Sequence, residues 1–141
     1  MLFHKLSDNN FFEVKHFAIN DRSIEKDFYK AFEIAKASDL ILLPLFIKVK
    51  AYRGTVGLSI DKLNFIKKIL RLKIPAVVLS LGNPYLLSLI PASVTYLCAY
   101  GDSPVSQIAM MKAISGEIKL NGKLPISIPR TKYSAGHGIT T

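Results

Sequence analysis

The sequence predicts an α/β fold: a three-layer α/β/α sandwich on a mostly parallel sheet, whose first strand we expect to be missing. Two observations predict it. Along residues 39–115, apolar strand-like runs alternate with helical patterns, and such alternation is typical of parallel sheets with helices on both faces. The composition agrees, with 50% hydrophobic and 21% charged residues in a chain of 141, as in one globular domain with a real core.

The clearest signal comes from two strand-to-helix joints, GNPY at residues 82–85 and GDSP at residues 101–104. In each joint an apolar run ends at a glycine, and a capping residue followed by a proline then opens a helix. Asn83 and Ser103 are good N-cap residues, and a proline at the first helical position loses no hydrogen bond. We therefore predict two turns of the same design along one edge of the sheet, where open α/β sheets usually place function.

The N-terminal third predicts a strand, a helix and a second strand. Residues 11–19 alternate loosely between apolar and polar side chains, as in a strand. Ser23 is expected to cap a helix over residues 24–37. Residues 39–47 are almost entirely apolar and indicate a strand buried on both faces.

The rest of the chain continues the alternation after a polar loop over residues 48–58. Ser59 is expected to cap a helix that runs to residue 72. The other expected elements are strands over residues 76–81 and 94–100, helices over 84–89 and 104–115, and a loop-like end from residue 119. We place the sandwich domain in residues 1–129 and a tail or linker in residues 130–141.

Charge is spread unevenly along the chain, whose net charge is +9. Residues 1–39 carry six Lys and Arg against seven Asp and Glu, whereas residues 40–141 carry thirteen against three. A basic face could meet an anionic partner. Because no nucleic-acid-binding motif is present, we favour a merely solvated basic face and expect no nucleic-acid partner.

The sequence gives no sign of a membrane span. The longest apolar run, residues 40–47, has eight residues and contains a proline, which is far too short to cross a bilayer. The N-terminus has no apolar stretch typical of a signal peptide. The compartment stays open between bacterial cytoplasm, periplasm and secretion.

Residues 80–129 resemble the C-terminal domain of family 3 glycoside hydrolases. The matching pieces are SLGNPY at 80–85, AYG at 99–101, GE at 116–117 and GKLPISIP at 122–129, in matching order and spacing. The likeness extends from about residue 39 onward. The GNPY turn and the preceding GTVGL at 54–58 are most similar to the bacterial β-N-acetylglucosaminidase branch.

This resemblance implies an accessory domain that buttresses a catalytic (β/α)₈ barrel absent from this chain. In that branch the barrel carries the aspartate nucleophile and a histidine acid/base, so the resemblance implies no catalytic residue here, no cofactor, and a carbohydrate substrate held by the barrel. His16 and His137 lie in fragments that only partly mimic the family's histidine motif. We assign neither a catalytic role and expect the isolated domain to be inactive.

Four residues are candidates for contact with the substrate or the barrel: Arg53, Asn83, Tyr85 and Asp102. Arg53 lies in the long loop that follows the strand at residues 39–47. For three of them we favour a structural role: Asn83 as a helix cap, Tyr85 as a core or rim tyrosine, and Asp102 as a residue that orders its turn and favours the helix dipole. Retaining hydrolysis normally needs two carboxylates close together, and no Asp or Glu occurs between Asp39 and Asp61.

Other kinds of site find little support. One cysteine and three histidines provide no metal-ligand spacing, and no G-x-S-x-G elbow or glycine-rich phosphate loop is present. The absence of tryptophan weakens a free-standing carbohydrate-binding module. Two alternatives remain: a stand-alone flavodoxin-like domain that binds a phosphorylated or nucleotide ligand at the two joints, and a basic module for an anionic polymer.

Overall fold

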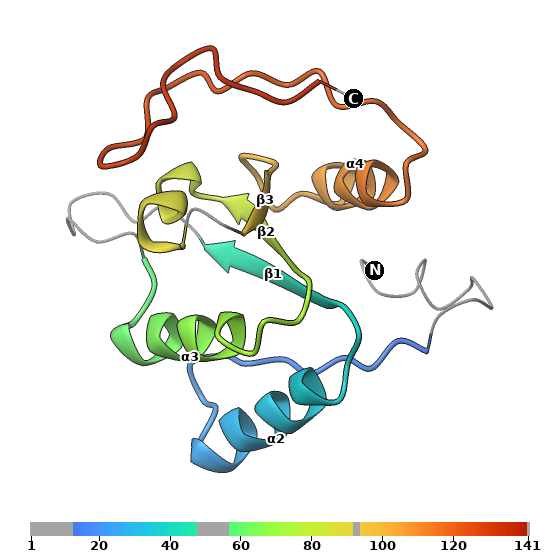
Figure 1. Cartoon of the computed structure of the whole chain (residues 1–141), viewed down its shortest axis with the longest axis vertical. Helices are drawn as coiled ribbons and strands as arrows, with labels where there is room; N and C mark the ends of the chain where they lie inside the picture. The colour runs from blue at the N-terminus through green and yellow to red at the C-terminus, as the bar shows by residue number, and fades with distance from the viewer. Residues whose placement is uncertain (1–12, 48–56, 92–93, 141) are drawn as a thin grey trace.

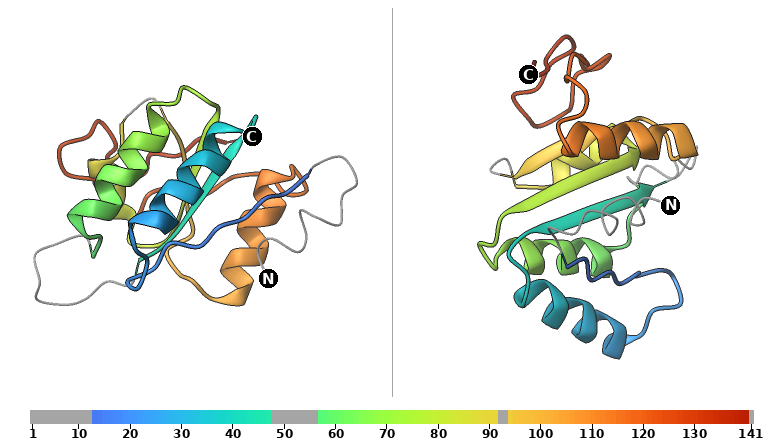
Figure 2. Two further views of the ribbon diagram at one scale, coloured as in Figure 1. Left: turned by 90° about the horizontal axis from the view of Figure 1, so that it is seen from below. Right: turned by 90° about the vertical axis from the view of Figure 1, so that its right-hand side faces the viewer.

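The computed structural model describes residues 13–47, 57–91 and 94–140. Over these residues the chain is an α/β protein with an open, all-parallel sheet of three strands and helices on both faces (Figure 1). Figure 2 shows the sheet edge-on, with α4 on one side and α2 and α3 on the other. The predicted sandwich class is therefore confirmed.

The sheet has the order β1-β2-β3, with β1 (Ile41–Ile47), β2 (Ala76–Gly82) and β3 (Thr95–Cys98). All strands are parallel, and Val78 of β2 lies in register with Leu43 of β1 and Tyr96 of β3. β2 is thus the central strand. Its alternate side chains enter opposite cores, which explains why the run over residues 76–81 is apolar at nearly every position.

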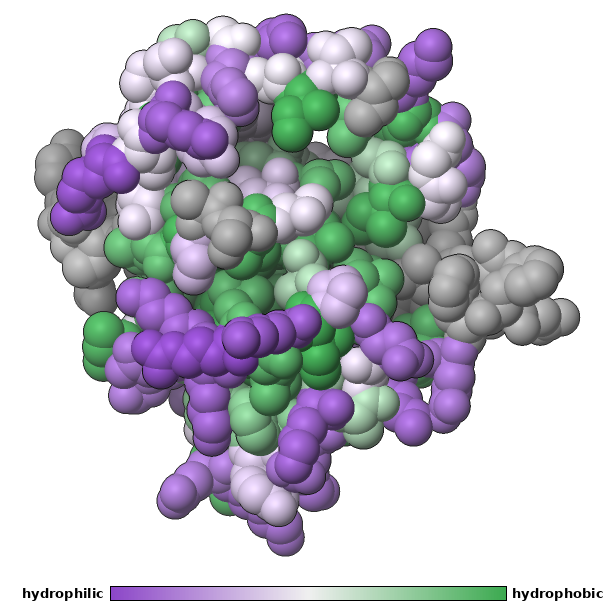
Figure 3. All heavy atoms as spheres, in the orientation of Figure 1, coloured by the Kyte–Doolittle hydropathy of each residue, from purple (hydrophilic) through white to green (hydrophobic). Residues whose placement is uncertain are grey.

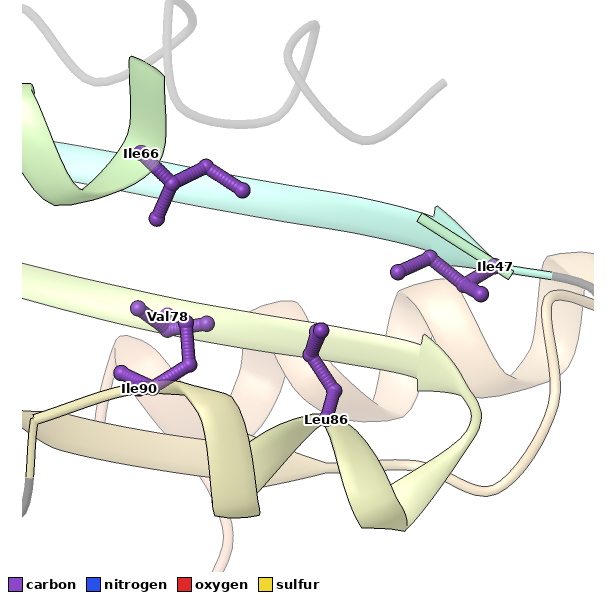
Figure 4. Packing of buried hydrophobic residues seen from close by; sticks show 5 residues of the cluster. All are labelled: Ile47, Ile66, Val78, Leu86 and Ile90. Atoms are coloured by element: carbon purple, nitrogen blue, oxygen red, sulfur yellow. The ribbon is translucent and has the colours of Figure 1, made fainter. Parts of the chain in front are cut away.

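One face of the sheet is covered by α2 (Glu25–Lys36), α3 (Ile60–Leu70) and the 3₁₀ helix η1 (Pro84–Leu89). Figure 4 shows the core that joins α3 and η1 to the sheet, formed by Ile47, Ile66, Val78, Leu86 and Ile90. A second cluster between α2, α3 and β1 contains Ala35, Ile41 and Ile69. The inner face of α3 is formed by Leu63, Ile66 and Ile69, which are all buried.

The opposite face carries α4 (Pro104–Ile114). Leu79 and Leu81 of β2 pack here against Met110 of α4. Because Leu79 and Val78 are consecutive, their side chains necessarily leave β2 on opposite faces. Within the described residues, no helix is long and apolar enough to cross a membrane.

The expectation of a strand over residues 11–19 is wrong for residues 13–19, the part that the structure describes. Residues 13–20 form no strand, and most of their side chains are exposed. The apolar side chains of this loose alternation therefore do not form one buried face. The helix expected from Ser23 begins later, at Glu25. Ser23 instead accepts a hydrogen bond from the Asn20 amide (3.0 Å), while the carboxylate of Asp27 accepts one from Ile24 (2.9 Å) and caps α2.

Residues 122–138 fold back on themselves as an irregular hairpin, which we call the C-terminal hairpin. The amide of Leu124 donates to the His137 carbonyl (2.8 Å), and the amide of Ile128 donates to the Tyr133 carbonyl (2.9 Å). Both pairs have the antiparallel register of one hairpin. The domain boundary predicted at residue 129 falls within it and remains a prediction.

Candidate functional site

The carboxyl ends of β2 and β3 lie side by side, because the two strands are parallel and in register. Each strand leads directly into a helix, β2 into η1 and β3 into α4. The two predicted joints therefore meet at one edge of the sheet, as expected. This edge is the candidate site that the sequence indicates.

The first joint is held together by its own residues. Gly82 has a φ of +137°, and a Cβ atom at this position would overlap the Ile47 carbonyl oxygen of β1. The buried Ser80 hydroxyl donates to the Asn83 carbonyl (2.9 Å), and the Asn83 side-chain oxygen accepts from the Tyr85 amide (3.0 Å). The capping role of Asn83 is confirmed.

The second joint uses the same kind of cap but not the same glycine. Ser103 Oγ accepts from the Ser106 amide (3.2 Å), and the Gln107 side chain donates to the Asp102 carbonyl (2.9 Å). The left-handed residue here is Tyr100, with a φ of +53°, and Gly101 has only an ordinary contact near its Cβ position. The predicted similarity of the joints holds for their caps and prolines, and is wrong for their glycines.

Three of the four candidate site residues lie on these joints. Asn83 is buried, with 5% of its surface exposed, whereas Tyr85 is 41% exposed and Asp102 is exposed. Arg53 and its loop lie outside the described residues. The edge therefore offers Tyr85 and Asp102 to a partner, while Asn83 serves the turn.

Sequence reasoning missed a groove of about 850 Å³ beside β3. It lies between β3, α4 and the C-terminal hairpin, and it is lined mainly by apolar residues, which include Leu97, Val105, Ala109, Leu124 and Tyr133. The only hint in the sequence is the recurrence of apolar residues such as Ile118 and Leu120 in a segment with no helix or strand pattern.

Burial changes the acidity of three side chains near this groove. Burial raises the pKa of the Tyr96 phenol well above its usual value, and the nearby Ser80 hydroxyl offsets this only in part. Burial also raises the pKa of the Cys98 thiol and of the Tyr100 phenol. All three groups are therefore neutral at physiological pH, and none is a prepared nucleophile or base.

The described residues contain no group of three or more His, Cys, Asp or Glu side chains that could hold a metal ion. Among the described residues, the edge offers the Asp102 carboxylate for hydrogen bonding and the Tyr85 ring for stacking or hydrogen bonding. These groups suit recognition and docking.

No protein-family model, curated protein or solved structure matches this chain. The fold places it among open α/β domains. The resemblance to family 3 glycoside hydrolases stays a prediction from the sequence of residues 80–129.

Proposed function

We propose that this chain is an accessory C-terminal domain of a retaining glycoside hydrolase similar to β-N-acetylglucosaminidases. Its role is to buttress a separate (β/α)₈ barrel that carries the catalytic groups and binds the carbohydrate. The observation that carries the proposal is the order and spacing of SLGNPY, AYG and GKLPISIP over residues 80–129.

The way the first joint is built supports a scaffolding role. Gly82 is needed for close packing against Ile47, and the side chain of Asn83 satisfies a backbone amide. These residues fix the edge of the sheet. Tyr85 and Asp102 are exposed on this edge, and with Arg53 they are the proposed contacts to the barrel or the substrate.

The alternative, a flavodoxin-like domain that binds a phosphate or nucleotide, has less support. Free backbone amides at helix N-termini are what such sites offer. Here the Tyr85 amide is taken by Asn83 and the Ser106 amide by Ser103. Addition of ADP or inorganic phosphate is therefore expected to leave the melting temperature unchanged, and a rise would favour this alternative.

A domain exchange tests the proposal directly. We would replace the C-terminal domain of a bacterial β-N-acetylglucosaminidase with this chain and measure hydrolysis of p-nitrophenyl N-acetyl-β-glucosaminide. The chimera should retain activity and melt at a higher temperature than the barrel alone, because the domain covers its docking surface. A chimera no more stable or active than the barrel alone would contradict the proposal.

Single substitutions locate the contact in this chimera. Asp102→Ala and Tyr85→Ala should lower its melting temperature or activity, because both side chains project from the proposed docking edge. Lys30→Ala provides the control, since Lys30 lies exposed on α2, a helix that belongs to neither joint. The isolated chain should not hydrolyse the substrate; measurable turnover would show that the barrel is not needed.

A further inference from the structure

We propose that the groove beside β3 binds an extended acidic peptide, which adds to the sheet as a fourth strand. The groove adjoins the joint edge, since Pro84 also lines it, but the inference does not rest on the proposed function. It would hold equally for a domain with no role in glycoside hydrolysis.

The backbone of β3 provides the first argument, because β3 is an outer strand of the three-stranded sheet. The amide of Ala99 donates to the Ser80 carbonyl (3.0 Å), so residues 95, 97 and 99 direct their backbone groups toward β2. By alternation, the amide and carbonyl groups of Tyr96 and Cys98 point away from β2. They face the side on which an added strand would pair.

The lining of the groove provides the second argument. Six consecutive residues, 95–100, line it. Successive side chains of a strand point to opposite faces, so a groove that touches all four residues of β3 lies along the edge of that strand. Its other walls are Val105 and Ala109 of α4 and Leu124 of the C-terminal hairpin. Figure 3 shows apolar surface in the hollow beneath the uppermost layer of the view.

The charged residues of the segment that borders the groove indicate which kind of peptide would bind there. Residues 118–140 contain Lys119, Lys123, Arg130 and Lys132 but no Asp or Glu. Lys123 lines the groove itself, and its ammonium group donates to the Gly138 carbonyl (3.2 Å). A strand with apolar side chains on one face and carboxylates on the other would match both the apolar walls and Lys123, in a segment that carries positive charges and no Asp or Glu.

The probe is a fluorescent peptide of about eight residues, roughly the length of an ordinary strand, in which Glu alternates with Val. Binding is measured by fluorescence anisotropy with the full chain. We expect saturable binding that weakens as salt is raised, because exposed charges are screened. A peptide of Lys alternating with Val, and one of Glu alternating with Gly, should each bind at least about tenfold more weakly.

Two variants place the binding in the groove. Ala109→Phe fills it from an exposed helical position, and Lys123→Glu reverses its charge; each should weaken binding at least about tenfold. The controls are Ala109→Ser and Lys30→Glu, which should bind as the unmodified chain does. Amide hydrogen exchange adds a second readout: the peptide should protect the amides of Tyr96 and Cys98, which face the groove.

Three results would overturn the proposal. The first is equal binding of the Glu-Gly peptide, which would mean a general polyanion site. The second is acidic-peptide binding that survives Ala109→Phe. The third is a concentration-dependent dimer, seen by sedimentation and abolished by Ala109→Phe, in a chain that binds none of the peptides; the occupant would then be a second copy.

Discussion

Among single residues, Gly82 is the one whose identity the tertiary structure most clearly requires. Its φ of +137° lies in a region that only glycine adopts readily. The Ile47 carbonyl also occupies the space that a side chain would need. Gly101, which looks equivalent in the sequence, meets neither condition.

We expect Gly82→Ala to lower the free energy of unfolding by about 3 kcal/mol, from backbone strain and the clash with β1. Gly101→Ala should change it by less than about 0.5 kcal/mol. Urea denaturation followed by circular dichroism measures both. Equal losses in the two variants would show that the joints depend on their glycines in the same way.

At the scale of single elements, the helices of this chain begin in different ways. Ser103 caps α4 with its side chain, whereas Ser59 stands at the N-cap of α3 without a side-chain hydrogen bond. α2 begins after Ile24, which is 65% exposed. A serine before a helical pattern therefore marks the boundary well, but it does not show whether its hydroxyl satisfies a backbone amide.

Ser103→Ala should destabilise the protein by about 1 kcal/mol, because it leaves an amide in the first turn of α4 without its acceptor. Ser59→Ala should cost only a few tenths of a kcal/mol, since no such bond is lost. Thermal unfolding of the two variants in parallel separates these cases. A larger loss for Ser59→Ala would contradict the capping assigned here.

At the scale of the whole molecule, the sheet has packed apolar side chains on both of its faces, and β3 is one of its two outer strands. The Tyr96 hydroxyl is buried, with no hydrogen-bond partner among the described residues. With Cys98 and Tyr100, it forms a group of side chains whose pKa values are all raised in the folded state. The stability of the fold therefore depends on these side chains staying protonated.

We expect the free energy of unfolding to fall as the pH rises above about 8.5, where the Cys98 thiol of the unfolded chain ionises, and more steeply above about 10, where the tyrosines do. The folded protein retains these protons longer, so unfolding releases them and is favoured by alkali. Each group contributes at most about 1.4 kcal/mol per pH unit.

Tyr96→Phe tests this directly. It should reduce the loss above pH 10 and should not destabilise the protein at pH 7, because it removes a buried hydroxyl that has no partner there. Urea denaturation at the two pH values provides both numbers. An unchanged alkaline loss would mean that Tyr96 does not cause it.

Much of the fold could be predicted because its signals are local. The caps and prolines at Asn83 and Ser103 predict the starts of η1 and α4, and the apolar run over residues 76–81 predicts β2 almost to its ends. The prediction of a strand failed over residues 13–20 because strand formation depends on contacts that are not local. A strand exists only if another strand pairs with it, and weak alternation does not reveal a partner.

The sequence by itself determined the fold class, most of the elements and the edge at which the two joints meet, because helix caps, glycine turns and apolar periodicity act over a few residues. Only the tertiary structure decided that Gly82 packs against β1 while Gly101 does not, and that a groove opens between β3 and the C-terminal hairpin. These features arise where segments far apart in the chain approach each other, and that approach depends on packing across the whole molecule.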